Sequence, residues 1–283
     1  MEWVERLNRS LEFIEEHLTD EIDYEQLGRI ACCSAYHYQR MFTYMAGITL
    51  AEYIRRRKMS LAAVDLQSGN EKIIDIALKY GYNSPTAFNR AFQSFHGIPP
   101  SAVKKEGAEI KAFSPIVFSI AVKGAFEMNY RIEKKEPFRI VGISMPLDKN
   151  IENNFASVPK MWQECAANGT VEKLAGMMDT QPMGLLGVSA CNDTEQWKYF
   201  IAVSSSIPAD GFEEYTVPAC TWAVFSGKGT NRSIQELERR IITEWLPDSG
   251  YEYANAPDIE VYISPDPQNA EYEVWIPVVK KKT

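Results

Sequence analysis

One pattern of residues occurs twice in this sequence, at a constant offset of fifty residues and without a gap. The matching positions hold a serine, two aromatic residues, an amide, an arginine and a glycine: Ser34 and Ser84, Tyr38 and Phe88, Gln39 and Asn89, Arg40 and Arg90, Phe42 and Phe92, and Gly47 and Gly97. Two copies of one helix-turn-helix unit are the simplest interpretation of such a repeat. The first part of the chain should therefore be helical.

The second copy shows where its helix begins and ends. Ser84 is a favourable N-cap, and Pro85 takes the first helical position, where a missing N–H costs nothing. Gly97 and the two prolines beyond it stop the helix. Within these limits, aromatic residues share one stripe and polar residues share another. The polar stripe consists of Thr86, Asn89, Arg90 and Gln93. These side chains suit contact with base edges and phosphates in a DNA groove.

Charge is unevenly distributed along the chain. The net charge is −8, which argues against a protein that binds nucleic acids through charge alone. Residues 1–108 hold 13 Lys and Arg against 14 Asp and Glu, so nearly all of the negative excess lies in the rest of the chain. Phosphates respond to the field within about one Debye length, so this separation matters more than the total. We expect a DNA reader that relies on contacts in the groove.

The cysteines and histidines form no metal-binding pattern. None of the five cysteines belongs to a CxxC motif, and the three histidines lie far apart in the sequence. We expect reduced thiols, no metal and no cofactor. The acidic N-terminus lacks an apolar signal region, and the longest apolar run, residues 115–122, is too short to span a bilayer. These features predict a cytoplasmic protein that makes no membrane contact.

The period of apolar residues changes near residue 129. Before it, helices are expected; after it, strands and helices alternate. We predict an N-terminal all-α domain with two helix-turn-helix units over residues 1–107, a linker over residues 108–127, and a C-terminal α+β domain with a duplicated β-α-β-β unit over residues 128–283. The expected helices cover residues 3–18, 23–31, 34–46, 49–68, 72–80, 84–97, 158–168 and 233–246. The expected strands cover residues 130–144, broken near Pro137, 183–190, 198–204, 215–227, 259–263 and 272–279.

Residues 5–106 resemble the AraC/XylS family of bacterial transcription regulators. The resemblance is carried by residues 34–42, 53–59, 75–92 and 97–100. In that family two helix-turn-helix units enter successive major grooves, and most members activate transcription. The resemblance implies double-stranded DNA and RNA polymerase as partners. It also implies the DNA-binding residues Ser34, Tyr36, Gln39, Arg40, Thr43, Ser84, Pro85, Thr86, Asn89 and Arg90. A solvated surface arginine is the alternative interpretation of Arg40 and Arg90.

Residues 128–281 resemble the GyrI-like small-molecule-binding domain, which is also fused to multidrug-responsive regulators. The matching segments are residues 215–225 and 270–278. In that family an acidic residue on a late strand lies in a groove with aromatic residues and receives cationic or amphipathic aromatic ligands. Glu273 is the matching acid, and Glu260 on the preceding strand stands where some relatives carry a second one.

The residues themselves also favour an effector site for a cation. Alternation along a strand places Glu273 and Trp275 on one face, and a carboxylate beside an aromatic ring attracts positive charge. The remaining wall is predicted to come from Trp222, Trp162, Tyr199 and Tyr262. Core packing is an equally good interpretation of each of these aromatic residues.

Three functions fit these features. The favoured one is a transcription regulator, not an enzyme, whose C-terminal domain binds a small aromatic or amphipathic effector. The second is a hydrolase of reactive small molecules that uses Glu273 as general base. The third is a protein-interaction module. The DNA-binding repeat favours the first.

Overall fold

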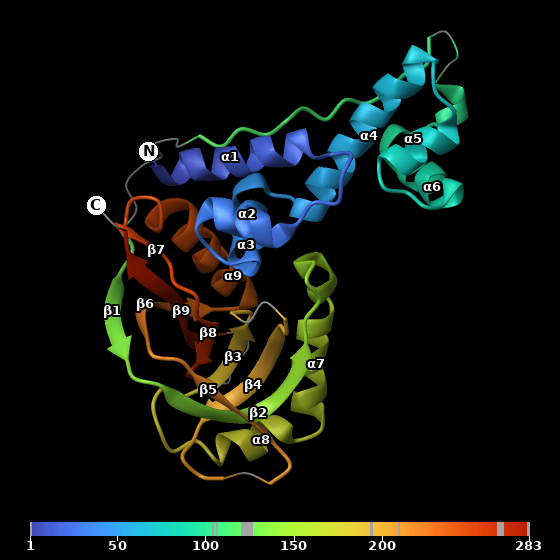
Figure 1. Ribbon diagram of the computed structural model, residues 1–283. Coiled ribbons are helices and arrows are strands. Elements are labelled where there is room, and N and C mark those ends of the chain that lie inside the picture. The colour runs from blue at the N-terminus through green and yellow to red at the C-terminus, as the bar shows by residue number, and fades with distance from the viewer. Residues whose placement is uncertain are drawn as a thin grey trace. The chain divides into compact units, whose positions relative to one another are not determined.

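The computed structural model describes residues 2–103, 105, 107–119, 127–192, 195–208, 210–264 and 269–281, with the side chains of residues 2 and 231 left out. The chain divides into two units, which are described separately (Figure 1). Unit 1 contains Met1–Ala31 and Ala46–Ile120, and unit 2 contains Cys32–Met45 and Ala121–Thr283. The first predicted recognition helix thus belongs to unit 2. The domain boundaries after residue 107, where the linker was predicted to begin, and at residue 128, where the second domain was predicted to begin, stay predictions.

Unit 1 is helical, as the repeat predicts. Its helices are α1 (Glu2–Glu16), α2 (Tyr24–Ala31), α4 (Leu50–Ser68), α5 (Ile73–Lys79), α6 (Pro85–His96) and a short 3-10 turn, η1 (Pro100–Ala102). The side chain of Thr49 accepts a hydrogen bond from the Glu52 amide at 3.2 Å, and Ser84 accepts one from the Ala87 amide at 3.4 Å. Gly97 ends α6 with a positive φ of 82°. The predicted N-cap of α6 and the predicted start of α4 are therefore confirmed.

The aromatic stripe of α6 is buried. Phe88 and Phe92 are fully buried in a core that α4 and α5 complete with Met59, Leu66 and Ile76. The opposite stripe of α6 faces solvent. This helix has the amphipathic arrangement that its sequence predicts.

The described part of the predicted linker is not a free connector. The Phe113 amide donates to the Ser60 hydroxyl at 2.8 Å. The side-chain amide of Asn8 pairs with both backbone groups of Phe118, at 2.8 and 3.0 Å. Residues 107–119 therefore belong to unit 1. Residues 120–126 of the predicted linker lie outside the described part of the chain.

Unit 2 is built on one antiparallel sheet with the order β1-β6-β9-β8-β3-β4-β2-β5, and β7 also pairs with β9. The two halves share a strand order, β2-β4-β3 and β6-β9-β8, and they meet where β3 pairs with β8. The strands are β1 (Tyr130–Lys135), β2 (Phe138–Pro146), β3 (Leu185–Ala190), β4 (Lys198–Ser204), β5 (Glu213–Val217), β6 (Cys220–Gly229), β7 (Tyr251–Tyr253), β8 (Asp258–Tyr262) and β9 (Ala270–Lys280).

The helical segments of unit 2 differ in places from the prediction. They are α3 (Ala35–Ala46), η2 (Ile151–Asn154), α7 (Ser157–Ala167), α8 (Thr170–Ala175), α9 (Asn231–Arg240) and the π-helical turn η3 (Ile241–Trp245). The helix predicted to have Ser233 as its N-cap has Thr230 in that position, three residues earlier. The single strand predicted around Pro218 is two strands, since proline cannot donate to a sheet ladder. Helix α8 and strand β7 were not predicted.

The described residues contain neither a candidate membrane-spanning helix nor a candidate metal site. No helix among them combines the length and apolar composition needed to cross a membrane. In the same part of the chain, no three His, Cys, Asp or Glu side chains are arranged to hold a metal ion.

Candidate functional site

The sheet register places Glu260 and Glu273 on opposite faces. Across the β8–β9 pair, Glu273 stands opposite Val261, and Glu260 stands opposite Val274. Cross-strand partners point to the same face, whereas successive residues of a strand point to opposite faces. The two predicted acids therefore cannot line one site.

Glu273 is already neutralised by an arginine. Its carboxylate accepts hydrogen bonds from Arg131 at 2.8 and 3.0 Å and from the Trp275 indole at 2.9 Å. Trp275 points to the same face of the sheet as Glu273, as predicted. However, Trp275 and Trp222 are both buried in the hydrophobic core on that face. In this structure the carboxylate is paired and both rings are core residues, so a ligand at these three residues stays a prediction.

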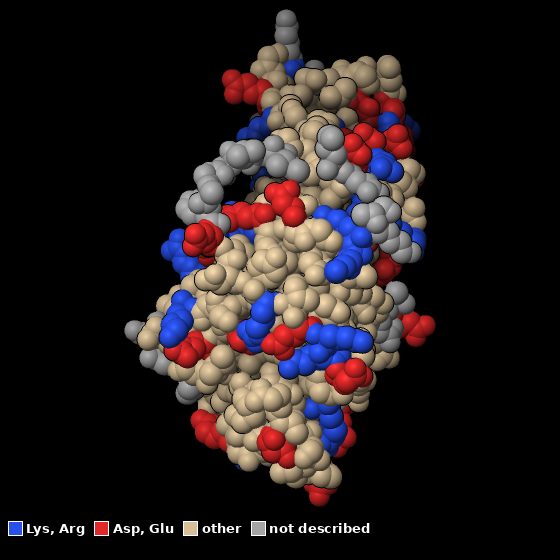
Figure 2. Space-filling view, turned by 90° about the vertical axis from the view of Figure 1, so that its left-hand side faces the viewer, with Lys and Arg blue, Asp and Glu red and all other residues tan. Residues whose placement is uncertain are grey.

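Charges of both signs are mixed around this ion pair. Glu133 on β1 accepts from Arg131 and from Lys135, whose ammonium also lies 5.4 Å from the Trp275 ring. Figure 2 shows Lys and Arg side by side with Asp and Glu over the face that it presents. Exposed pairs of this kind contribute about 1 kcal/mol or less. Among the described residues of this view, neither sign of charge dominates.

The other predicted ligand residues come together on the opposite face. Tyr262 donates to Glu260 at 2.7 Å, and the Trp162 indole on α7 donates to the Tyr199 hydroxyl at 2.9 Å. The rings of Trp162 and Tyr262 meet edge to face, 5.2 Å apart. Glu260, Tyr262 and Trp162 are only half-buried. One acid with three aromatic residues is thus held by β4, β8 and α7.

A glycine leaves room for this group. A Cβ at Gly187 of β3 would lie 2.4 Å from the Tyr199 hydroxyl and 3.1 Å from a carboxylate oxygen of Glu260. The Tyr199 ring and Glu260 therefore occupy the space that any other residue would fill.

We expect Gly187→Ala to displace the Tyr199 hydroxyl and to weaken binding of any ligand at Glu260 by about tenfold, since misplacement of about 1 Å is enough for large losses. Calorimetric titration with an aromatic cation provides the measurement. Gly176→Ala is a suitable control, because a Cβ there meets nothing nearer than 3.5 Å. Unchanged affinity in folded Gly187→Ala would show that Tyr199 does not shape the site.

The carboxyl group of Glu260 is electrostatically unusual. Desolvation, followed by the negative charge of Glu238 on α9 and a hydrogen bond with it, raises the pKa of Glu260 to about 8. Burial and the charge of Glu260 also raise the pKa values of Tyr199 and Tyr262, so both phenols stay neutral. A carboxyl group that titrates near neutral pH and is flanked by aromatic rings is typical of a functional site.

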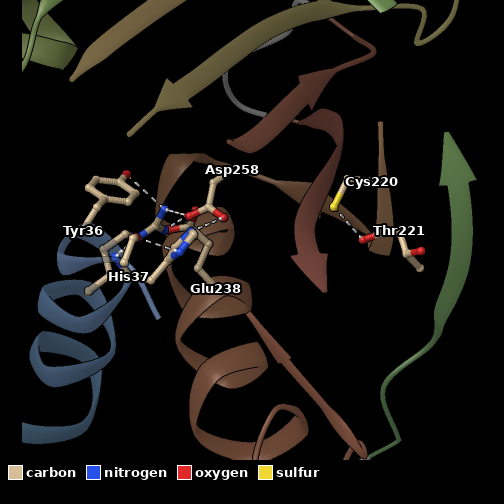
Figure 3. A network of polar contacts seen from close by, with 8 residues as sticks. Tyr36, His37, Cys220, Thr221, Glu238 and Asp258 are labelled. Carbon is tan, nitrogen blue, oxygen red and sulfur yellow. Dashed lines mark hydrogen bonds and ion pairs between the residues drawn. The ribbon is translucent and has the colours of Figure 1, made fainter. Parts of the chain in front are cut away.

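Helix α3 packs against the same face of the sheet (Figure 3). The guanidinium of Arg40 lies 2.8 Å from Asp258 on β8 and 2.7 Å from Glu238 on α9. Tyr44 donates to the other oxygen of Glu238 at 2.6 Å. His37 approaches Asp258 at 3.2 Å and stacks on Tyr253. The predicted base-reading face of α3 is thus turned into unit 2.

Other predicted DNA-binding residues of α3 are also engaged. Gln39 donates to the Lys149 carbonyl at 2.8 Å and accepts from the Ile151 amide at 3.3 Å. Tyr36 is buried edge to face against Trp197. In this arrangement Tyr36, Gln39 and Arg40 are all engaged within unit 2, and their contacts with bases stay a prediction. Ser34 caps α3, and Thr43 bonds to the α3 backbone.

The charges at this contact are firmly fixed. Burial alone would raise the pKa of Asp258, but His37 and Arg40 together hold it below its ordinary value. Burial alone would lower the pKa of Arg40, but Glu238 and its other neighbours raise it well above its ordinary value. Both groups are therefore ionised throughout the neutral range. Asp258, Glu238, His37 and Tyr44 were not predicted from the sequence. The alternation in residues 258–262 was a signal for Asp258 alone, because it places Asp258 and Glu260 on the same face of the strand.

Helix α6 differs from α3 in exposure. Ser84, Pro85, Thr86, Asn89 and Arg90 are all exposed. The predicted DNA-binding residues of the second copy are therefore accessible within unit 1, and their contacts with bases stay a prediction.

Comparison with known proteins identifies both parts of the chain. The model of the GyrI-like small molecule binding domain matches residues 128–279, more than half of the chain. The chain belongs to the GyrI-like family. A helix-turn-helix domain model matches residues 27–106.

The chain is similar to proteins that match different shares of its length. The HTH-type transcriptional activator AarP of Providencia stuartii is 38% identical over 95 residues, which cover 34% of this chain and 70% of AarP. The right origin-binding protein of Escherichia coli (strain K12) is 25% identical over 284 residues, covering 94% of this chain and 95% of that protein. A structure described as SAV2435 bound to tetraphenylphosphonium is 20% identical with a TM-score of 0.48, covering 54% of this chain and 94% of that one.

The combination of domains defines the general function. The chain is a DNA-binding transcription regulator of the AraC type with a GyrI-like small-molecule-binding domain. The hydrolase and protein-interaction alternatives are not favoured, since AarP is named as a transcriptional activator.

Proposed function

We propose that this GyrI-like regulator is a transcription activator whose effector is a hydrophobic cation bound at Glu260. The observation that carries the proposal is the half-buried Glu260 carboxyl group with Tyr199, Tyr262 and Trp162 around it. Activation is supported by the likeness to AarP, which is named as an activator. RNA polymerase is then the expected protein partner. We propose no enzymatic activity for the chain.

The chemistry of the site favours a cation over a neutral ligand. An ionised carboxylate in a partly desolvated site attracts positive charge more strongly than it would in water. Aromatic faces add quadrupole attraction for the same charge. Edge-to-face packing of Trp162 on Tyr262 leaves ring surface beside the acid. A flat or globular aromatic cation satisfies both kinds of group.

The test is calorimetric titration and thermal melting with tetraphenylphosphonium and with neutral triphenylphosphine oxide. We expect the cation to bind and to raise the melting temperature, because a ligand that binds only the folded state stabilises it. Glu260→Gln should remove most of this gain and should spare any binding of the neutral compound. Glu273→Gln is the matched control, since that acid is paired with Arg131 on the other face. Equal losses in both variants would refute a charge-reading site at Glu260.

The DNA-binding half yields a separate prediction. Arg90→Ala should weaken binding to a duplex selected from a random pool by about tenfold, because the exposed guanidinium can donate to a guanine edge or a phosphate. Fluorescence anisotropy measures the affinity, and Arg29→Ala on α2 serves as an exposed control. If a folded Arg90→Ala protein binds as tightly as the wild type, Arg90 does not contact the selected DNA.

A further inference from the structure

The polar stripe of α6 is exposed, whereas Arg40 in the matching stripe of α3 is bound by carboxylates. The Arg40 side chain is only 12% exposed and is bound by Asp258 and Glu238. Arg40 also lies over the rings of Tyr36 and Tyr44. A guanidinium fork binds carboxylates with the same geometry that it uses for phosphates. The acids of unit 2 thus occupy donors that a DNA backbone or base edge would need.

The acids that hold α3 are continuous with the effector site. Glu238 contacts Arg40 and lies near enough to Glu260 for its negative charge to raise the pKa of that group. Asp258 and Glu260 are two positions apart on β8 and therefore point to the same face. Three carboxyl groups converge here, and Arg40 supplies a positive charge to them. The cluster already binds one cation, the guanidinium of Arg40.

We propose that α3 competes with the effector for this acid cluster, so that binding of a hydrophobic cation at Glu260 releases α3 for DNA. The inference rests on the proposed function, because it takes Glu260 as the effector acid. A cation beside Glu260 provides the positive charge that Glu238 otherwise receives from Arg40. The effector therefore has a higher affinity for the state in which α3 is free, which is the condition for a ligand to shift such an equilibrium. By reciprocity, DNA raises the affinity for the cation by the same factor.

Glu238→Gln provides the central test, because it keeps the side-chain volume and removes the charge that binds Arg40. Without any ligand, this variant should bind the selected duplex about fivefold more tightly than the wild type, the lower end of common coupling strengths. Tetraphenylphosphonium should produce the same gain in the wild type and little further gain in Glu238→Gln. Glu273→Gln, which removes an acid of the same unit outside the cluster, should behave like the wild type.

Hydrogen–deuterium exchange provides a readout that needs no DNA. The Ile151 amide donates to Gln39 of α3, so release of α3 should speed exchange at Ile151. Tetraphenylphosphonium should cause this change in the wild type, and Glu238→Gln should show it without ligand. Asp258→Asn is the second variant if Glu238→Gln fails to fold, since Asp258 is the other acid that binds Arg40.

The outcomes separate this inference from the proposed function. If tetraphenylphosphonium binds at Glu260 but changes neither DNA affinity nor exchange at Ile151, the competition is refuted and the effector site stands. If it does not bind, yet Glu238→Gln binds DNA more tightly, the effector assignment fails and the restraint on α3 is supported. Unchanged DNA affinity in both folded acid variants would show that the α3 contact does not restrain the regulator.

Discussion

Phe92→Ala should lower the free energy of unfolding of unit 1 by about 3–5 kcal/mol and should abolish DNA binding through α6. The Phe92 side chain is fully buried, and its ring lies 5.6 Å from Phe88 and 4.1 Å from His96. Alanine would leave a cavity between α4, α5 and α6, whose other residues are already close-packed. Urea unfolding followed by circular dichroism measures the loss, and anisotropy with the selected duplex measures DNA binding.

Ser94→Ala is the matched control for Phe92→Ala. Ser94 lies on the same helix two residues away and is exposed, so its replacement should change stability by less than about 0.5 kcal/mol. Because the chain has two units, the unfolding curve is expected to resolve into two transitions, of which only the one from unit 1 should move. A Phe92→Ala protein with the wild-type transition would contradict the packing of α6.

The elements that were predicted correctly depend on near neighbours in the sequence. The caps of α4 and α6 each need a side chain and an amide three residues apart. Strand β4 has the predicted bounds, because it is a continuous apolar run between polar residues. The burial of Phe88 and Phe92 follows from their spacing on one helix. Local chemistry decides such features, so the sequence contains them.

The choice between Glu260 and Glu273 could not be made from the sequence. Alternation correctly placed Glu273 with Trp275 on one face of β9. It could not show which face of the sheet the helices cover, nor that Arg131 would reach Glu273 from a strand 142 residues earlier. These facts depend on the register of β8 against β9 and of β1 against β6. Pairing between distant strands therefore decided which of the two acids is paired with an arginine.

The position of α3 was beyond sequence reasoning for a different physical reason. Helices α3 and α6 match at one offset and both have polar stripes, so they predict the same partner. A polar stripe specifies donors but does not specify whether phosphates or carboxylates accept from them. Asp258 lies 218 residues from Arg40, and Glu238 comes from a different helix. Only the tertiary structure could show that unit 2 supplies the acceptors.

The affinity of this GyrI-like regulator for a hydrophobic cation should rise about a hundredfold between pH 6 and pH 9 and should level off above about pH 8. Desolvation and the charge of Glu238 raise the pKa of Glu260 to about 8, and only the ionised carboxylate attracts the cation. The ionised fraction grows from about 1% at pH 6 to about 90% at pH 9. Titration of tetraphenylphosphonium in buffers of different ionisation enthalpy should show release of nearly one proton per cation bound at pH 7.

In the protein without ligand, the raised pKa of Glu260 has the opposite effect: it makes the folded state less stable as the pH rises. The folded pKa of Glu260 lies above its unfolded value, so its contribution to stability is complete below the unfolded pKa and is lost as the pH rises through about 8. Asp258 has a lowered pKa, and its contribution is lost only in acid. Between pH 6 and pH 9, the ligand-free melting temperature should therefore fall while the gain produced by the cation grows.

Controls isolate Glu260 from the groups that face it. Those groups are Tyr262 on β8, Tyr199 on β4, Glu238 on α9 and Arg40 on α3. The raised pKa values of both tyrosines and of Arg40 keep these groups from titrating in this range. The side chain of His37 contacts Asp258 at 3.2 Å. Glu260→Gln should give a flat pH profile, and so should triphenylphosphine oxide with the wild type. A slope that persists in Glu260→Gln would assign the proton to another group, and the effector acid would then have to be sought there.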